Sequence, residues 1–280
     1  MIGQKQQRIL IMLKTRLIPC IITKGDLVVQ SFSFNHYLPI GNIKTAIEFF
    51  VNWDVDEIVI MDIDASIKCQ EPNVNLVEWA AKACFVPLVV GGGIKTIEHI
   101  QKLLKAGADK VCINSIVRDE ISFVTEASNM FGDQCITVSV DVVKKNDEYK
   151  VFDYRDSKCF GSDLSKHLRE IEEAGAGEIL LNSVDRDGSR EGYDLELLKY
   201  VSSLVNIPVI AMGGVGRFEH LADAVLIGGC QAVAAANIFQ HLEHSTIAAK
   251  AQMLSSGLPV RLSSEVKYEN FALDVLGRPF

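Results

Sequence analysis

The stretch VPLVVGGGIKTIEHI, residues 86–100, recurs later in the chain as IPVIAMGGVGRFEHL, residues 207–221. Each copy is a short apolar run that ends in tandem glycines and leads into a segment with helical period. The offset of 121 residues also relates EIVIMDIDAS (57–66) to EILLNSVDRD (178–187) upstream. An internal repeat of this length indicates two equivalent structural halves.

Apolar runs alternate with helical segments along the chain, which is typical of βαβ units and a parallel sheet. Strands are predicted at residues 16–22, 57–62, 87–90, 110–114, 135–141, 178–182, 208–211 and 231–236. Helices are predicted at residues 45–52, 74–84, 96–105, 164–174, 195–204 and 218–226. Two equivalent halves of four strands predict a closed (β/α)8 TIM barrel with internal half-barrel duplication, because a doubly wound open sheet lacks this symmetry.

The domain organisation follows from chain length, since 280 residues is close to the size of one such barrel. No Pro, Gly or Ser-rich linker divides the chain, so we expect one barrel over residues 12–262. An N-terminal extension is expected at residues 1–11 and a C-terminal tail at residues 263–280. The polar stretch KKNDEYKVFDYRDS, residues 144–157, predicts a hairpin inserted into one loop.

Composition restricts the classes of function. The net charge of −8 argues against nucleic acid as a partner, because a phosphate-backbone binder needs a basic face. No apolar run is long enough for a membrane span, and the polar N-terminus does not resemble a signal peptide, so a cytoplasmic location is expected. Seven cysteines without a C-x-x-C pair predict reduced thiols, and six histidines show no metal spacing. Neither a metal nor a cofactor is therefore expected.

The tandem glycines predict anion sites. Without Cβ atoms the backbone can approach an anion, and the N–H groups of the following helix start point at it. The next strand in each half ends near an asparagine that supplies further donors. The phosphate-binding residues are predicted to be Gly92, Gly93 and Asn114 in one half and Gly213, Gly214 and Asn237 in the other. Two such sites across one barrel mouth predict a small-molecule ligand phosphorylated at both ends, the alternative being that the glycines only make tight turns.

Two acidic residues at strand ends are candidates for contact with this ligand. Asp141 ends a predicted strand, where its carboxyl group can act as a general acid or base. Asp187 lies beside Gly188 in the sequence DRDG and is predicted to bind substrate hydroxyls. The alternative for both aspartates is that they cap the following turn or helix.

Four motifs carry a resemblance to a known family: GGGIKT, GADKVCINS, GAGEILLNSVDRDGSREGYDLELL and IPVIAMGGVG. They resemble the cyclase subunit of imidazole glycerol phosphate synthase, over about residues 12–262. The isomerase barrel of the same pathway shares the duplicated phosphate sites, but DRDG followed by GYD favours the cyclase type. The resemblance implies a heterodimer, in which a glutaminase subunit docks on the bottom of the barrel and its ammonia travels through the interior to the substrate.

The resemblance also assigns residues at strand beginnings. Arg16, Glu57, Lys110 and Glu178 match a ring of four charges that gates the ammonia passage, and Asp109 matches a residue at the glutaminase interface. The alternative is that these are ordinary solvated charges at strand starts. Since two positive and two negative residues occur together, we favour the gate.

Several positions depart from the cyclase pattern. The family uses two catalytic aspartates on opposed strands; Asp141 matches one, but Ile22 stands where the first strand should end in the other. Gln30 replaces a substrate-binding lysine, and Met212 and Asn237 replace two serines of the second phosphate site. Loss of one member of an acid–base pair costs on the order of 10²–10⁴ in rate.

An intact gate with altered cyclase chemistry resembles a paralogous branch of the family. In that branch the barrel works with a glutaminase and a separate sugar amidotransferase to add acetamidino groups to bacterial surface sugars. We therefore expect an ammonia-channel barrel that serves this modification. The alternatives are an authentic cyclase of histidine biosynthesis that tolerates Ile22, and a subunit without ammonia transfer whose role is allosteric or structural.

Overall fold

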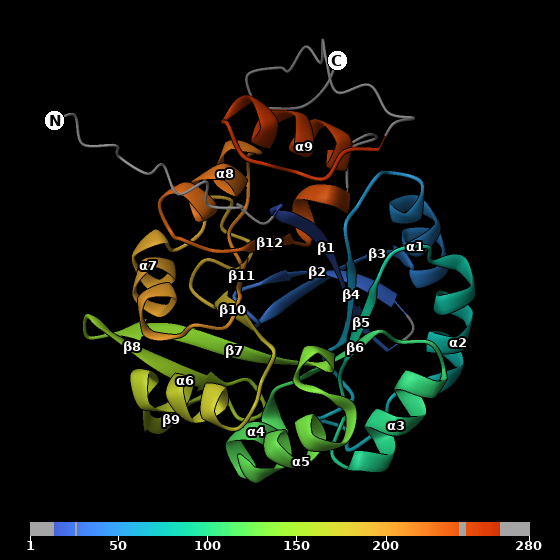
Figure 1. Cartoon of the computed structure of the whole chain (residues 1–280), viewed down its shortest axis with the longest axis vertical. Coiled ribbons are helices and arrows are strands. Elements are labelled where there is room, and N and C mark those ends of the chain that lie inside the picture. The colour runs from blue at the N-terminus through green and yellow to red at the C-terminus, as the bar shows by residue number, and fades with distance from the viewer. Residues whose placement is uncertain (1–13, 26, 241–244, 264–280) are drawn as a thin grey trace, which may run out of the picture.

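Eight parallel strands close into a barrel at the centre of the molecule (Figure 1). The computed structural model describes residues 14–25, 27–240 and 245–263. In order around the barrel, the strands are β1 (Arg16–Lys24), β4 (Ile58–Asp62), β5 (Leu88–Gly91), β6 (Lys110–Ile113), β7 (Ile136–Lys145), β10 (Glu178–Ser183), β11 (Val209–Met212) and β12 (Ala232–Ala235). Because β10 pairs with β7 and β12 pairs with β1, the sheet closes on itself, and the predicted TIM barrel is confirmed.

Helices surround the barrel on its outside (Figure 1). They are α1 (Ile43–Val51), α2 (Val74–Ala83), α3 (Ile97–Lys105), α4 (Ser115–Asp119), α5 (Ser122–Phe131), α6 (Leu164–Glu173), α7 (Leu195–Leu204), α8 (Glu219–Leu226) and α9 (Ser245–Ser255). Two single turns, η1 (Asp133–Cys135) and η2 (Asn237–Gln240), complete the set. Side-chain caps begin several of the helices: Thr96 accepts from the backbone N–H of His99, and Asp194 accepts from that of Leu197.

Alternation along each strand divides the core into two layers. On β1, Leu17 and Ile21 pack outward against the helices, whereas Ile18, Cys20 and Ile22 pack inside the barrel. This division follows the period of two of an extended strand. The barrel interior is therefore filled mostly by apolar side chains, as in other barrels of eight strands.

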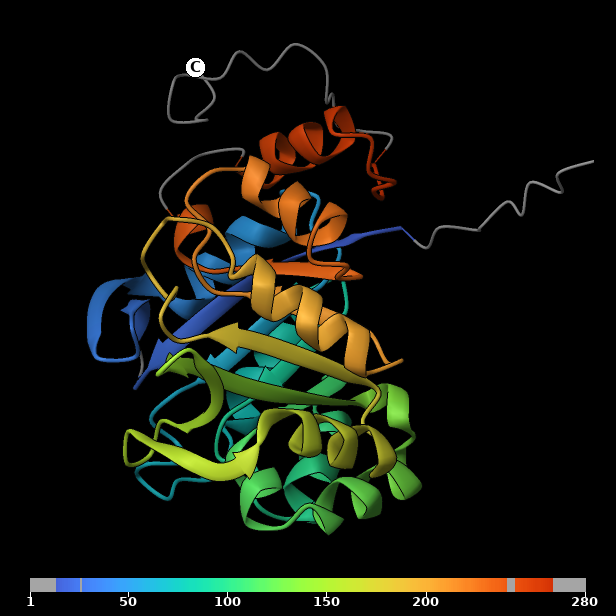
Figure 2. The same ribbon diagram turned by 90° about the vertical axis from the view of Figure 1, so that its left-hand side faces the viewer.

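Two antiparallel hairpins are added to the barrel. The strands β8 (Glu148–Asp153) and β9 (Lys158–Asp163) extend β7 as an antiparallel hairpin. The hairpin expected at residues 144–157 includes β8 and the turns on either side of it but ends before β9. The strands β2 (Leu27–Phe32) and β3 (His36–Asn42) form a second hairpin that the sequence analysis did not predict. Figure 2 shows both hairpins at the end of the barrel to which the strand arrows point. We call this end the mouth and the opposite end the bottom.

The β2–β3 hairpin was missed because its turn lacks the usual signals. Ser33 and Phe34 turn the chain with φ of 50° and 54°, in a region that glycine and asparagine occupy most readily. Helices α4, α5 and α9 were also missed, whereas each predicted strand begins within one residue of the observed one.

Apart from Ser263, the expected terminal segments are not part of the described structure. Residues 1–11, and the tail beyond Ser263, lie outside the described residues. The barrel itself starts near Thr15, which forms an isolated parallel bridge with Val260. Among the helices in the described part of the chain, none combines the length and apolar character needed to cross a membrane.

Candidate functional site at the barrel mouth

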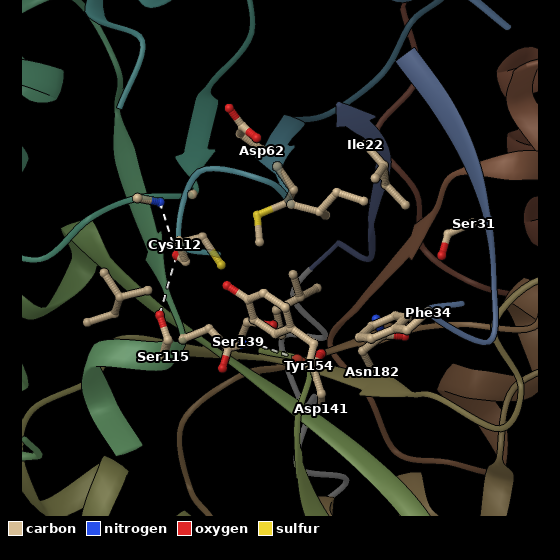
Figure 3. Close-up of a pocket in the computed structure, with 18 of the residues that line it drawn as sticks. Ile22, Ser31, Phe34, Asp62, Cys112, Ser115, Ser139, Asp141, Tyr154 and Asn182 are labelled. Atoms are coloured by element: carbon tan, nitrogen blue, oxygen red, sulfur yellow. Dashed lines mark hydrogen bonds between the residues drawn. The ribbon is translucent and has the colours of Figure 1, made fainter. Parts of the chain in front are cut away.

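A cavity of about 80 Å³ opens at the mouth and contains Asp141 in its wall (Figure 3). Asp141 is 3% exposed, and its Oδ2 accepts a hydrogen bond of 2.7 Å from Asn114 Nδ2. Burial raises the pKa of Asp141 to about 6, against the opposing effects of the Arg118 charge and the Asn114 hydrogen bond. A carboxyl group with this pKa can exchange a proton with a bound ligand near neutral pH.

Ile22 lies on the opposite side of the same cavity from Asp141 (Figure 3). It ends the inward-facing series of β1 and is 4% exposed. Asp62 also lines the cavity, but its Oδ1 accepts from the backbone N–H groups of Asp64 and Ala65, at 3.0 and 3.1 Å. Asp62 is thus occupied in holding a turn, and Asp141 faces an apolar side chain where a second proton-transfer group would be needed.

The first glycine pair lines the cavity beside the hydroxyl groups of Ser66 and Ser115. Gly92 and Gly93 have φ of 109° and 71°, and a Cβ on Gly92 would lie 2.3 Å from the backbone oxygen of Asp62, so only glycine fits. The Gly93 N–H donates to Ser66 Oγ at 3.3 Å, and Ser115 Oγ donates to Ser66 Oγ at 3.4 Å (Figure 3). The predicted site residues Gly92, Gly93, Asn114 and Asp141 are therefore brought together.

Tyr154 is a cavity residue that the sequence analysis missed. It comes from the turn of the β8–β9 hairpin, and its hydroxyl group hydrogen-bonds with Ser66 and Ser115. Arg155 fixes this turn through bonds of 2.6 and 2.8 Å to the carboxylate of Asp119. One feature of the sequence could have indicated Tyr154: the polar stretch of residues 144–157 contains three aromatic residues.

The second glycine pair lines a separate, smaller cavity of about 20 Å³ with Gly188 and Asn237. Gly213 and Gly214 have φ of 96° and 101°, like the first pair. The predicted ligand-binding group Asp187 lies at this cavity, but its Oδ2 accepts from Ser31 Oγ at 2.6 Å. Both halves thus contain a glycine turn, while their surroundings differ.

Two histidines hold these turns in the same way. His99 Nδ1 accepts from the backbone N–H of Lys95 at 3.3 Å, and His220 Nδ1 accepts from that of Gly216 at 3.2 Å. Both contacts span four residues and occupy equivalent places in the two halves. These contacts give both histidines a structural role in the glycine turns.

Four charged side chains meet at the bottom of the barrel. Arg16 contacts Glu57 at 2.8 Å and Glu178 at 2.5 Å. Lys110 contacts the same two carboxylates, at 3.3 and 2.8 Å. The charges alternate around a closed ring, so the convergence expected of these four side chains is observed. Asp109, next to Lys110, accepts from the backbone N–H of Leu88 at 2.8 Å and so anchors the start of β5.

One wall of the interior between ring and mouth is polar. On β7, Thr137, Ser139 and Asp141 face inward at successive alternate positions, and all are at most 6% exposed. Thr137 Oγ1 is buried without a hydrogen-bond partner among the described residues. The remaining wall is mostly apolar and includes Ile18 and Leu180.

A family model described as "Histidine biosynthesis protein" matches residues 16–245. The chain belongs to this family. The matched region contains all eight barrel strands, the charge ring and both glycine pairs.

Two relatives of the family are similar over nearly their whole length. A protein of Vibrio vulnificus is 68% identical over 269 residues, which is 96% of this chain and 99% of that protein. A protein of Campylobacter jejuni is 42% identical over 251 residues, 90% of this chain and 100% of that protein. Both carry the provisional name imidazole glycerol phosphate synthase subunit hisF2.

Within the described residues, no group of three or more His, Cys, Asp or Glu side chains is placed to hold a metal ion. All seven cysteines are free, and Cys20 and Cys112 lie inside the barrel. Burial raises the pKa of Cys20 to about 12, so this thiol remains neutral at physiological pH.

Proposed function

We propose that this chain is the ammonia-receiving barrel of a glutamine amidotransferase and that it serves acetamidino modification of a bacterial surface sugar. The observation that best supports this proposal is the ring formed by Arg16, Glu57, Lys110 and Glu178 at the bottom of the barrel. Such a ring is a poor way to stabilise a fold, because apolar replacements of buried ion pairs are often neutral or stabilising. A closed ring of charges at one end of the barrel interior therefore favours a role in the passage of ammonia through the barrel.

The interior above the ring suits neutral ammonia. Carrying an ammonium ion through a mostly apolar barrel would require desolvation of a full charge, whereas neutral ammonia needs only hydrogen-bond partners. The hydroxyl groups of Thr137 and Ser139 offer such partners between the ring and Asp141. The ring is neutral overall, and each carboxylate is already paired with both Arg16 and Lys110, so it offers an ammonium ion no uncompensated negative charge.

The partner that delivers the ammonia is proposed to be a glutaminase subunit docked on the bottom. The names of the Vibrio and Campylobacter relatives describe subunits of a synthase, in keeping with a heteromeric assembly. Phe85, in the loop before β5, is 89% exposed, and an aromatic side chain so placed is a favoured anchor at protein interfaces. Asp109 lies at the same end and was assigned to this interface by family resemblance.

The mouth favours a role other than cyclisation. Asp141 can exchange one proton, but Ile22 cannot take part in the paired transfers that cyclisation needs. In this proposal the ammonia leaves the mouth for a sugar amidotransferase. The second candidate, an authentic cyclase of histidine biosynthesis, is favoured by the relatives' names and by the first glycine site.

The experiment is to purify the chain with its glutaminase and to measure glutamine hydrolysis with and without the barrel. The proposal expects the barrel to activate glutamine hydrolysis. A second assay supplies the bisphosphate intermediate of histidine synthesis together with ammonium salt. Its turnover should be at least about a hundredfold slower than an ordinary enzyme rate near 1 s⁻¹. Absence of glutaminase activation would contradict a role in ammonia transfer. Cyclase turnover near 1 s⁻¹ would establish the second candidate instead.

A further inference from the structure

We infer that the mouth accepts a ligand with a single phosphate group, held at the Gly92–Gly93 side, and that the Gly213–Gly214 side is closed to phosphate. This revises the two-phosphate ligand expected from the repeat. The inference rests on the proposed function in so far as the mouth is taken to bind a phosphorylated molecule. It names the class of that molecule as a phosphate monoester.

The first step is the division of the mouth into two cavities. The cavity with Asp141 and the cavity with Gly213 have Met212 as their one shared lining residue, so this side chain forms the wall between them. The two volumes are about 80 and about 20 Å³. Since one water molecule needs about 10–15 Å³ by this measure, the second cavity has room for a water molecule but not for a phosphate group.

The second step is that the β2–β3 hairpin already contacts two polar side chains of the second site, those of Asp187 and Asn237. Asp187 accepts from Ser31 Oγ at 2.6 Å and from the Phe34 backbone N–H at 3.3 Å. Asn237 Nδ2 donates to the Ser31 backbone oxygen at 3.0 Å. Gly188 lies directly beneath the hairpin, since a Cβ there would lie 2.7 Å from the same oxygen. A phosphate at this side would have to displace these contacts.

The third step is that several hydrogen-bond donors of the first site line the larger cavity. The Gly93 N–H and the hydroxyl groups of Ser66, Ser115 and Tyr154 converge on one region of the larger cavity. The contacts of the Gly93 N–H and of Ser115 Oγ with Ser66 Oγ are long, at 3.3 and 3.4 Å, so these groups bind one another weakly. An anion with several oxygens could accept from all of them at once.

The fourth step is a buried positive charge behind this site. Arg118 is 8% exposed and contacts Asn114 Oδ1, the Phe152 backbone oxygen at 3.3 Å and Asp153 Oδ1 at 3.2 Å. Its Nε is buried without a hydrogen-bond partner among the described residues. The guanidinium group also lies 5.9 Å from the Tyr154 ring centroid, so its charge adjoins the converging donors.

The body of the ligand would lie between the first site and Asp141. Aromatic side chains from both hairpins, Phe34 and Tyr154, line this space (Figure 3). Asn182, 6% exposed, lines it as well, and its Oδ1 has no hydrogen-bond partner among the described residues. Asp141 and Asn182 together fit a ligand body that carries hydroxyl or amino groups.

The test compares two probes that differ by one phosphate group, ribose 5-phosphate and ribose 1,5-bisphosphate, by calorimetric titration of the full chain. The wild-type protein should bind the bisphosphate no more than about threefold tighter, since only one end finds donors. Met212→Ser should raise this preference to about tenfold or more by opening the wall and adding a hydroxyl donor. Tyr154→Phe should weaken ribose 5-phosphate about fivefold, the value of one hydrogen bond.

Tyr149→Phe is the matched control, because Tyr149 lies on the same hairpin but its hydroxyl donates to Asp194, away from the cavity. It should leave both affinities unchanged. A wild-type preference for the bisphosphate of tenfold or more would overturn the inference, and so would failure of both probes to bind. Glutaminase activation, measured on the same preparations, reports on the proposed function separately, so either conclusion can fail alone.

Discussion

Asp141 is an acidic residue buried deeply in the wall of the mouth cavity. Burial raises its pKa to about 6 from an ordinary value of 3.8, so the folded protein binds its proton more tightly than the unfolded chain does. The ionised form therefore destabilises the fold above about pH 6. This penalty fades as the pH falls through about 6 and is absent below 3.8. A cost of this kind is typical of functional positions.

Asp141→Asn should accordingly stabilise the protein at pH 7.5. Two pKa units correspond to about 3 kcal/mol as an upper bound, and the asparagine can still accept from Asn114. The gain should shrink steadily between pH 6 and pH 4. Urea unfolding at pH 7.5 and at pH 4 measures it, and a variant less stable than wild type at pH 7.5 would show that the carboxylate contributes favourably to folding.

In our proposal, Ile22 and Met212 distinguish this mouth from that of a cyclase in two respects. Ile22 removes a proton-transfer group, and Met212 closes the second cavity. We predict that Ile22→Asp alone recovers little cyclase activity, because the bisphosphate substrate still has one end without a site. Ile22→Asp combined with Met212→Ser should gain at least about tenfold over Ile22→Asp. Turnover of the histidine intermediate with ammonium salt measures both, and equal rates would argue that Met212 is no barrier.

Individual site residues differed in how far the sequence could predict them. Asp141, Gly92 and Gly213 were predictable because each lies at the end of a predicted strand, and parallel strands bring their carboxyl ends to one mouth. The expected strand end at Asp141 was wrong, because β7 continues to Lys145 to pair with β8. Tyr154 was not, because it reaches the cavity only through the way its hairpin docks. The contacts of Asp187 were hidden for the same reason, since they depend on the unpredicted β2–β3 hairpin.

Strand β7 links the two ends of the barrel through inward-facing polar groups. Its alternation places Thr137 near the ring, because Thr137 pairs with Glu178, and places Asp141 at the mouth. The Thr137 hydroxyl is buried without a partner among the described residues, which ordinarily costs about 1–3 kcal/mol. An unpaired hydroxyl group inside a mostly apolar barrel is suited to bind a small polar molecule transiently.

Thr137→Val should therefore raise the free energy of unfolding by about 1 kcal/mol, because the shape is retained and the unpaired hydroxyl is removed. Thr23→Val is the matched control: Thr23 is similarly buried on β1, but its hydroxyl donates to the Met61 backbone oxygen. That variant should lose stability. Denaturant unfolding compares the two, and a loss in Thr137→Val as large as in the control would show that the Thr137 hydroxyl is satisfied in solution.

The two hairpins differ in whether a local sequence pattern could predict them. The β8–β9 hairpin was predictable from a polar insertion between a strand and a helix. The β2–β3 hairpin was not, because its strands continue an apolar series and its turn uses Ser33 and Phe34. Both hairpins lie over the mouth and meet through Phe34 and Phe152, whose ring centroids are 6.3 Å apart. They determine the shape of the site although the barrel determines its position.

The duplication made the architecture of the barrel predictable. Equivalent glycine turns in the two halves required equivalent strands, and closure followed from their number. The same reasoning placed Arg16 and Lys110 at one end, because residues that begin parallel strands share a face. Symmetry could not predict that the two mouth sites differ, because the difference arises from Met212 and the hairpin contacts.

Ammonia passage through the barrel is tested most directly by isotope transfer in the assembled system of barrel, glutaminase and sugar amidotransferase. Glutamine labelled with ¹⁵N at the amide is supplied with an excess of unlabelled ammonium, and the label in the amidated sugar is measured by mass spectrometry. Passage predicts mostly ¹⁵N product with the wild-type barrel. Lys110→Met should dilute the label, because it breaks the ring, whereas Lys166→Met, an exposed lysine on α6, should not. Product labelled no more than the bulk ammonium, with the wild-type barrel, would contradict ammonia passage.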